Sequence, residues 1–235
     1  MPYLRKRNIR KLGVSLMPKN KWTYGNSWDK YPIEEGEVWC DPASSSKIAV
    51  ADLRGDLPDF IVGIDLLYCD FPWNQGNVNS SITKAGMDKY IKSFDEFMDS
   101  LFSKISLINP KVCYLEIGKR HKCDFMEQLT KQFPIVQVWK ITYNRKNPCY
   151  LLRGGQSPIT FDFSGMDDES TPYAAIKADH PHSVADLCTG RGLTLLAAHK
   201  FGAKFFGTEL NKRILAAAIE RAAMEGIHYE KCNVQ

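Results

Sequence analysis

Short apolar segments alternate along the chain with stretches of helical periodicity, and this alternation limits the possible folds most strongly. Residues 61–69 form an apolar run that predicts a strand, and residues 87–108 carry apolar side chains at helical spacing. Further strands are predicted over 111–117, 135–143, 149–152, 183–187 and 204–207, and further helices over 121–133, 173–178, 193–201 and 212–226. Strands that alternate with helices through short connections predict an α/β fold with an open, mostly parallel sheet covered on both faces.

The length of the chain allows one domain with a substantial core. It has 235 residues, of which 44% are hydrophobic and 25% charged. We expect residues 61–235 to form this domain. Residues 1–60 are expected to be an accessory N-terminal segment whose pairing with the rest of the fold is left open. We expect residues 144–182 to be a linker, because from Gly154 to His182 the composition turns to Gly, Pro, Ser and Asp.

Composition narrows the kind of protein further. The apolar runs are too short to cross a bilayer, so we expect a soluble protein of the cytoplasm, or of a host cytoplasm if the source is a virus. The seven cysteines are widely spaced without a C-x-x-C pair, so neither a metal site nor a disulfide framework is expected. Basic residues cluster between positions 5 and 21 and again at Lys119, Arg120 and Lys122. Such clusters either hold the phosphates of a nucleic acid or are ordinary solvated surface.

A loop with two glycines follows the strand predicted over 183–187. Residues 185–194 read A-D-L-C-T-G-R-G-L-T, so Asp186 ends the strand while Gly190 and Gly192 lie in the turn before a helix. Glycine there permits positive φ and lets backbone N–H groups approach a ligand closely. Glu209 ends the next strand, where a carboxylate can accept both hydroxyls of a ribose. A loop that needs glycine for packing alone is the alternative, and the paired acid favours a nucleoside ligand.

An acidic and aromatic turn, Asp70-Phe71-Pro72-Trp73, ends the strand predicted over 61–69. An aromatic amine is a poor nucleophile because its lone pair is delocalised into the ring. Acceptors aimed at its two hydrogens, here the Asp70 carboxylate and a backbone carbonyl beside Pro72, favour a pyramidal nitrogen that can attack a methyl donor. Trp73 could stack on the base, a contact typically worth about 1–3 kcal/mol. In the alternative interpretation, Trp73 merely fills the edge of the core.

Together the two motifs resemble those of the amino-methyltransferases that modify adenine-N6 or cytosine-N4 in nucleic acids. These enzymes use S-adenosylmethionine (SAM) and carry an acceptor motif [D/N/S]-[P/I]-P-[Y/F/W] and a cofactor motif D-x-F-x-G-x-G. In this chain the acceptor motif comes first, which is the circularly permuted order of the β class. The resemblance therefore implies a Rossmann-like class I methyltransferase fold with permuted motif order.

The resemblance also assigns site residues by position. The catalytic turn that holds the target amine corresponds to Asp70, Phe71, Pro72 and Trp73. The positions that bind the cofactor are Asp186, Leu187, Cys188, Gly190, Gly192, Thr194, Glu209, Leu210, Asp70 and Pro172. Two site positions depart from the family pattern. In the catalytic turn Phe71 replaces a proline or isoleucine, and in the cofactor loop Cys188 replaces a phenylalanine. Neither change removes a reacting group.

The activity implied by the resemblance is SAM-dependent methylation of adenine-N6 in DNA. Methylation of cytosine-N4, of RNA or of another amine is the first alternative, and a non-catalytic subunit that binds cofactor or nucleic acid is the second. Residues 144–182 are the space available for a short target-recognition region. Still open are the recognition sequence, a homodimer or specificity partner, and a purpose in restriction-modification, regulation or phage biology.

Overall fold

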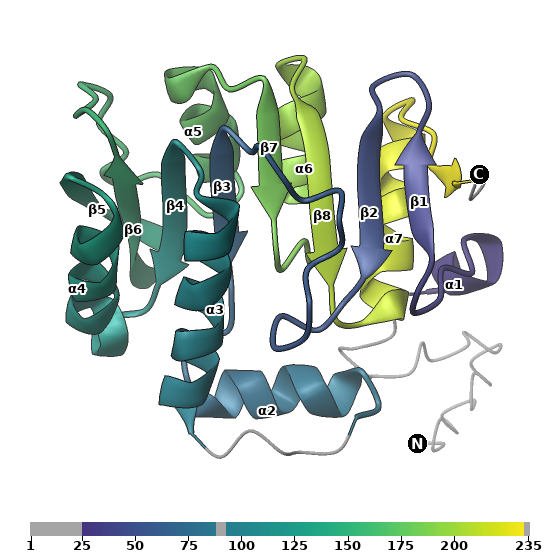
Figure 1. Ribbon diagram of the computed structural model, residues 1–235, viewed down its shortest axis with the longest axis horizontal. Coiled ribbons are helices and arrows are strands. Elements are labelled where there is room, and N and C mark those ends of the chain that lie inside the picture. Colours follow the sequence, from purple (N-terminus) through teal and green to yellow (C-terminus); the bar gives the residue numbers. More distant parts are fainter. Residues whose placement is uncertain (1–24, 88–92, 233–235) are drawn as a thin grey trace, which may run out of the picture.

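A computed structural model of the chain describes residues 25–87 and 93–232, which form one sheet with helices packed around it (Figure 1). The strands are β1 (Val38–Asp41), β2 (Ser46–Val50), β3 (Leu66–Asp70), β4 (Val112–Ile117), β5 (Ile135–Tyr143), β6 (Asn147–Gly155), β7 (Ser183–Asp186), β8 (Lys204–Glu209) and β9 (Glu230–Lys231). The helices are α1 (Ser27–Lys30), α2 (Gln75–Lys84), α3 (Phe94–Ile108), α4 (Lys122–Gln132), α5 (Thr171–Asp179), α6 (Leu193–Lys200) and α7 (Lys212–Met224). A short 3₁₀ turn, η1 (Lys119–His121), precedes α4.

The strand order is β5-β6-β4-β3-β7-β8-β2-β1-β9. The central strands from β4 to β2 run parallel, whereas β5 and β6 at one edge and β1 and β9 at the other are joined by antiparallel pairing. The sheet is therefore mixed: its centre is parallel as expected, and its edges are antiparallel. The edges differ because short turns join β1 to β2 and β5 to β6, and a short turn can connect only antiparallel neighbours.

The expected accessory segment contributes to this sheet. Strand β2 pairs in parallel with β8, with Ile48 opposite Gly207, and β1 pairs with both β2 and β9. The sequence leaves the pairing of this segment open. In the structure its strands β1 and β2 extend the sheet beyond β8. Residues 1–24, including the basic cluster between 5 and 21, lie outside the described residues.

The segment expected as a linker, 144–182, contains strand β6 and helix α5. A buried ion pair ties these two elements together, because the Arg153 guanidinium lies 2.6 Å from the Asp179 carboxylate and Arg153 is only 2% exposed. The Tyr114 hydroxyl donates a second hydrogen bond to Asp179 at 2.5 Å. Only the stretch between β6 and α5 keeps the irregular structure that the composition predicts.

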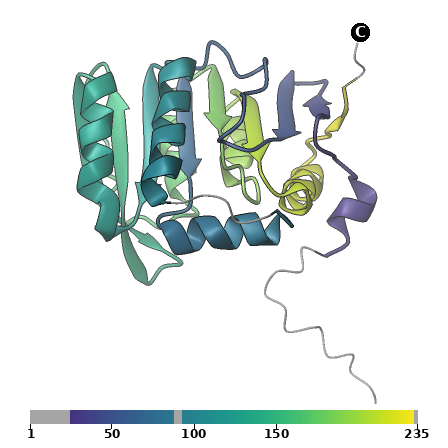
Figure 2. The same ribbon diagram turned by 60° about the horizontal axis from the view of Figure 1, so that its bottom comes forward.

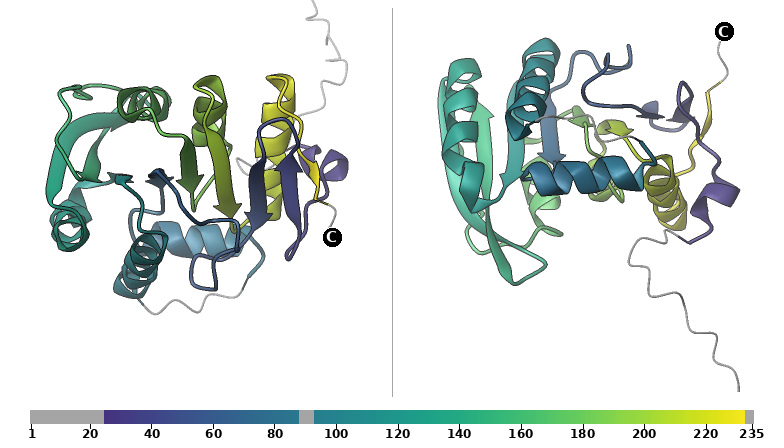
Figure 3. Two further views of the ribbon diagram at one scale, coloured as in Figure 1. Left: turned by 45° about the horizontal axis from the view of Figure 1, so that its top comes forward. Right: turned by 90° about the horizontal axis from the view of Figure 1, so that it is seen from below.

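Helices cover both faces of the sheet (Figures 2 and 3). Phe97 and Leu101 of α3 and Phe125 of α4 belong to the apolar cluster on one face, and Leu195 of α6 and Leu215 of α7 belong to that on the other. Helix α2 lies across the carboxyl ends of the central strands (Figure 3). Among the described helices, none is long and apolar enough to cross a membrane.

Candidate functional site

The two motifs meet at one edge of the sheet, although more than a hundred residues separate them. Strand β3 ends at Asp70 and pairs in parallel with β7, which ends at Asp186, so both motifs leave the sheet at the same edge. Strand β8 lies beside β7 and ends at Glu209. The carboxyl edge of parallel strands is where open α/β sheets bind ligands.

A cavity of about 480 Å³ joins the two motifs at this edge, within the range of small-molecule and cofactor sites. From the acceptor turn and the glycine loop its lining includes Asp70, Phe71, Pro72, Trp73, Leu187, Cys188, Gly190, Glu209 and Leu210. Helix α2 supplies another part of the wall through Asn77, Val78 and Ser81. Four of the expected cofactor positions do not line it, namely Asp186, Gly192, Thr194 and Pro172.

The glycine loop is fixed to the end of β8 through Glu209. The Gly190 N–H donates to Glu209 Oε2 at 3.0 Å, and the Asn211 N–H donates to Oε1 at 3.0 Å. Burial raises the pKa of Glu209, and the backbone N–H groups around it oppose that rise. Each carboxylate oxygen can accept more than one hydrogen bond, so Glu209 can hold the loop and still accept from a ligand hydroxyl.

Gly192 is required by the backbone and by the helix that packs on the loop. Its φ of +80° lies in the left-handed region, and a Cβ built there would lie 3.2 Å from the Cβ of Ala218 in α7. Gly190 also has a positive φ, +54°. Both glycines therefore shape the loop, but only Gly190 lines the cavity.

Asp186 lies beneath the loop and is only 3% exposed. Burial raises the pKa of Asp186 to about 7. Hydrogen bonds from the Thr194 side chain and the Cys188 N–H, the latter 2.9 Å long, oppose this shift. The negative charges of Asp70 and Glu209 add to it. Asp186 and Thr194 thus hold the loop by hydrogen bonds and place a carboxyl group next to it.

At the acceptor turn, the Trp73 ring is hydrogen-bonded to the Asp70 carboxylate. Trp73 Nε1 donates to Asp70 Oδ1 at 3.2 Å. The Asp70 side chain is open to the cavity, while protein surrounds it on its other sides. Burial raises the pKa of Asp70 to about 7, the Trp73 hydrogen bond opposes the rise, and the charge of Asp168 adds to it. Near neutral pH, Asp70 can therefore both accept hydrogen bonds and take up a proton.

Phe71 anchors the acceptor turn in the core. It is 2% exposed and stacks on Phe125 of α4 with ring centroids 4.8 Å apart and planes 8° apart. This neighbour explains why the turn accommodates an aromatic residue where the enzymes that the motif resembles have a proline or isoleucine. Its contribution is to the position of Asp70 and Trp73.

Tyr143, which the sequence gives no reason to choose, also lines the cavity. It ends β5 and meets Trp73 edge to face, with centroids 5.1 Å apart and planes at 70°. In the sequence it is only an aromatic residue at the end of a predicted strand, before Asn144 and Arg145. That signal acquires meaning only when the hairpin is folded beside the acceptor turn.

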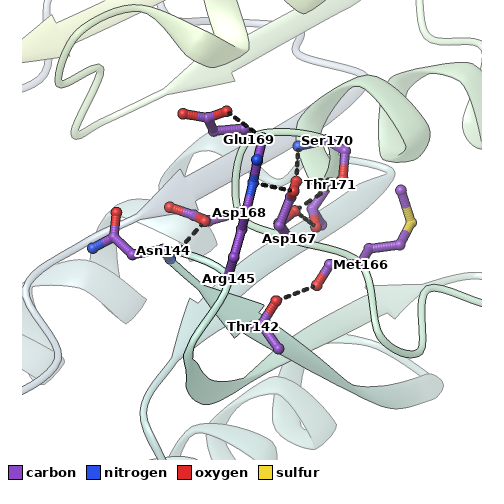
Figure 4. A network of polar contacts seen from close by, with 9 residues as sticks. All are labelled: Thr142, Asn144, Arg145, Met166, Asp167, Asp168, Glu169, Ser170 and Thr171. Carbon is purple, nitrogen blue, oxygen red and sulfur yellow. Dashed lines mark hydrogen bonds and ion pairs between the residues drawn. The ribbon is translucent and has the colours of Figure 1, made fainter.

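The segment before α5 holds the hairpin that carries Tyr143 (Figure 4). The Asn144 N–H donates to Asp168 Oδ1 at 2.9 Å, and the Arg145 guanidinium lies 3.3 Å from Asp167. Pro172 follows in the first turn of α5 and is buried. The segment that contains Pro172 therefore lies next to the site, because the charge of Asp168 acts on Asp70. Pro172 itself lies in the first turn of α5.

Within residues 25–87 and 93–232, no group of three or more His, Cys, Asp or Glu side chains is arranged to hold a metal ion. The cysteines of this region are free thiols.

Comparison with solved structures shows a methyltransferase-like α/β fold. TTHA0409 from Thermus thermophilus, a proposed DNA modification methylase, superposes with a TM-score of 0.54 over 76% of this chain and 94% of that chain, at 16% identity. Its complex with S-adenosyl-L-methionine superposes with a TM-score of 0.53. M1.HpyAVI matches with a TM-score of 0.53 over 74% of this chain and 97% of that chain, at 15% identity.

Sequence comparison gives a shorter match. A 49-residue stretch, 20% of the chain, is 47% identical to the ribosomal protein L11 methyltransferase of Lactobacillus delbrueckii subsp. bulgaricus. The match spans only 16% of the length of that relative. No family model matches the chain.

Proposed function

We propose that this chain is a SAM-dependent methyltransferase that modifies the exocyclic N6 amine of adenine in DNA. One observation carries the proposal: a single cavity is lined both by the Asp70 to Trp73 turn and by the Gly190 loop with Glu209. The shared fold of TTHA0409, which has been determined with S-adenosyl-L-methionine, supports the choice of cofactor. In the chain, the strand of the acceptor turn precedes that of the glycine loop, which supports the permuted β-class order.

The residues of the cavity suit SAM. Glu209 can accept from the ribose hydroxyls, and the backbone of Gly190 and Cys188 allows close approach of the ligand. Three carboxylates, Asp52, Asp70 and Glu209, line the cavity against two cations, Arg54 and Lys84, and Arg54 is paired with Asp52. With Asp186 buried nearby, the end of the cavity at Asp70 and Glu209 favours a cation such as a sulfonium. When bound, SAM supplies the methyl group and a sulfide leaving group.

The acceptor turn prepares the amine. The Asp70 carboxylate accepts a hydrogen bond from the amine, which localises the nitrogen lone pair for attack on the methyl carbon. Bound SAM would give up its methyl group to this nitrogen, and the electron pair of the broken S–C bond would stay on sulfur. The nitrogen then releases one proton, and Asp70, with its pKa near 7, can take it and pass it to water.

An aromatic corner receives the base. Trp73 and Tyr143 meet at a steep angle beside Asp70, and both line the cavity. Stacking on Trp73 offsets part of the few kcal/mol, roughly, needed to extract a base from a duplex. We choose adenine over cytosine because the acidic first residue of the turn resembles that of the adenine enzymes of this class.

Incubation with isotopically labelled SAM and DNA tests the proposal. We expect wild type to label DNA and Asp70→Ala to lose activity by about 100-fold or more, the scale of removing one well-placed polar group from a transition state. The exposed Asp59→Ala change is the matched control and should retain activity. Digestion of the product should yield methylated deoxyadenosine.

Other products would replace the proposal with a specific alternative. Methylated deoxycytidine would indicate a cytosine-N4 enzyme, and methylated ribonucleosides an RNA enzyme. If the chain binds SAM in calorimetry but labels no nucleic acid, it is a non-catalytic subunit.

A further inference from the structure

Three cations follow directly after the strand beside the acceptor turn. Lys119 and Arg120 lie in η1 and are exposed, and half-exposed Lys122 begins α4. We call these three residues the basic turn. Strand β4, which leads into it, pairs with β3 so that Glu116 lies opposite Asp70. The basic turn therefore lies at the same edge of the sheet as the cavity.

The basic turn follows directly after Gly118, and Gly118 contacts Trp73 of the aromatic corner. Gly118 packs against Trp73 so closely that a Cβ built there would lie 3.1 Å from Trp73 Cε3. Lys122 Nζ lies 4.8 Å from the centroid of the Tyr150 ring. Cations beside a stacking aromatic are a common arrangement for binding a nucleic-acid strand.

Within the described residues, the charges of the basic turn are not neutralised by carboxylates, and the contact of Lys122 with the Tyr150 ring leaves its positive charge in place. In the part of the chain that the structure describes, no carboxylate lies within ion-pair distance of Lys119, Arg120 or Lys122, whereas the neighbouring His121 lies 3.1 Å from Asp124. An unpaired surface cation can neutralise a phosphate and release its counterion, which strengthens binding at low salt.

The acids of the cavity give such cations a role at its rim. The lining carries the carboxylates of Asp52, Asp70 and Glu209 and the cations Arg54 and Lys84, and Arg54 is paired with Asp52. Asp168 raises the pKa of Asp70, and the charge of Asp70 raises that of Asp186, so both acids lie near this carboxylate. These negative charges suit a sulfonium but repel a phosphate backbone. Cations at the rim of the cavity, such as those of the basic turn, therefore add electrostatic attraction for a DNA strand that delivers a base here.

We infer that Lys119, Arg120 and Lys122 bind the phosphates of the DNA strand next to the extracted base. This inference rests on the proposed function and adds to it the surface that receives the substrate. The contacts hold the backbone while Trp73 stacks on the base, so they act on DNA affinity irrespective of sequence. The cofactor half of the cavity does not depend on them.

The test compares two triple variants in fluorescence anisotropy with a labelled DNA duplex over a range of salt concentrations. K119Q/R120Q/K122Q should bind DNA at least about tenfold more weakly at 0.1 M salt, and the slope of log affinity against log salt should fall by up to about 2.7. The control, K177Q/K200Q/K204Q, removes three exposed charges at the opposite edge of the sheet, where α5 and α6 end and β8 begins. It should match wild type.

Calorimetric titration with SAM checks that each variant remains folded, and both triple variants should bind SAM as wild type does. If wild type methylates DNA but the basic-turn variant keeps wild-type affinity and salt slope, the inference is overturned while the proposed function stands. If wild type neither binds nor methylates DNA, or binds and methylates only RNA of the same sequence, the proposed function fails and the inference with it.

Discussion

Asp70 combines two environments at the end of β3. Its carboxylate is open to the cavity, yet burial and the charge of Asp168 raise its pKa to about 7. The same side chain can therefore hold an amine as an acceptor and carry away the proton released from it.

The pH dependence of methyl transfer should report Asp70. Because the raised pKa belongs to an acid, the active ionised form is lost as the pH falls through about 7. We expect kcat/KM to drop about tenfold per pH unit on the acid side of this value, as for any single required ionisation. Asp70→Asn keeps an oxygen acceptor without the titration, so its lower activity should not change between pH 6 and pH 8. A retained acid limb in this variant would assign the ionisation to another group.

Gly192 shows how packing can add to a backbone requirement. Gly192 and Gly202 both have positive φ, +80° and +73°, but only Gly192 has a neighbour, Ala218, within contact of a built Cβ. We expect Gly202→Ala to lower the free energy of unfolding by about 1–2 kcal/mol through its backbone alone. Gly192→Ala should lower it by more and should also weaken SAM binding. Chemical denaturation measures the free energy of unfolding, and calorimetry measures SAM binding. If both variants lose the same free energy of unfolding, the contact of Gly192 with α7 has no role.

At the scale of elements, the ion pair between β6 and α5 secures the segment that borders the site. Arg153 and Asp179 are both largely buried, with side chains 2% and 10% exposed. Removing one partner of such a pair leaves a buried charge uncompensated, which typically costs about 3–5 kcal/mol.

Arg153→Leu should therefore lower the free energy of unfolding by about 3–5 kcal/mol, as measured by urea denaturation. Adding Asp179→Asn removes the uncompensated charge and should recover part of this loss, while the new side chain can still accept from the Tyr114 hydroxyl. A double variant no more stable than the single one would mean that packing of the arginine stem, and not charge, accounts for the loss.

The elements that the sequence predicts well are those whose pattern is local. Helix α7 and strands β5 and β7 have bounds close to the predicted ones, since their apolar spacing is regular. Helix α3 begins at Phe94, later than predicted, because the Ser93 side chain accepts from the Glu96 N–H and caps the helix there. Residues 88–92 of the predicted helix lie outside the described residues.

Helix α2 and strands β1 and β2 were missed for physical reasons. Helix α2 is mostly polar and buries only Val78 and Ile82, and its main local signal is the Asn74 side chain that accepts from the Asn77 N–H at 3.0 Å. Strands β1 and β2 are short, and β2 is stabilised by pairing with the distant β8. Their existence depends on contacts that no local pattern contains.

The same distinction applies to the site. Asp70 and Glu209 could be chosen from the sequence because each ends a strand, and parallel strands bring their ends to one edge. Tyr143 and the wall formed by α2 could not, because their positions depend on how a hairpin and a polar helix pack at that edge. The basic turn was visible as a charge cluster, but its place beside Trp73 was not.

For the whole molecule, the buried acids of the site make stability depend on pH. Asp70 and Asp186 have pKa values near 7 in the folded protein and an ordinary value of 3.8, so the folded state binds more protons between these values. The free energy of unfolding must then decrease as the pH rises from about 4 to about 8 on account of these groups. The site is electrostatically strained without a bound cation.

We therefore expect the ligand-free protein to have a higher Tm at pH 6 than at pH 8, as measured by thermal unfolding. Acids with lowered pKa, such as Asp65, act below this range and do not reverse the trend. Asp186→Asn should reduce the difference between the two pH values, and SAM should raise Tm more at pH 8 than at pH 6. A Tm that rises from pH 6 to pH 8 in the ligand-free protein would contradict this account of the charges.

The arrangement of the cavity is tested most directly by a crystal structure of the chain with SAM. The account predicts that the ribose hydroxyls lie within hydrogen-bond distance of Glu209 and that the methyl group faces the space between Asp70 and Trp73. SAM bound elsewhere, or bound with its methyl group turned away from Asp70, would contradict it.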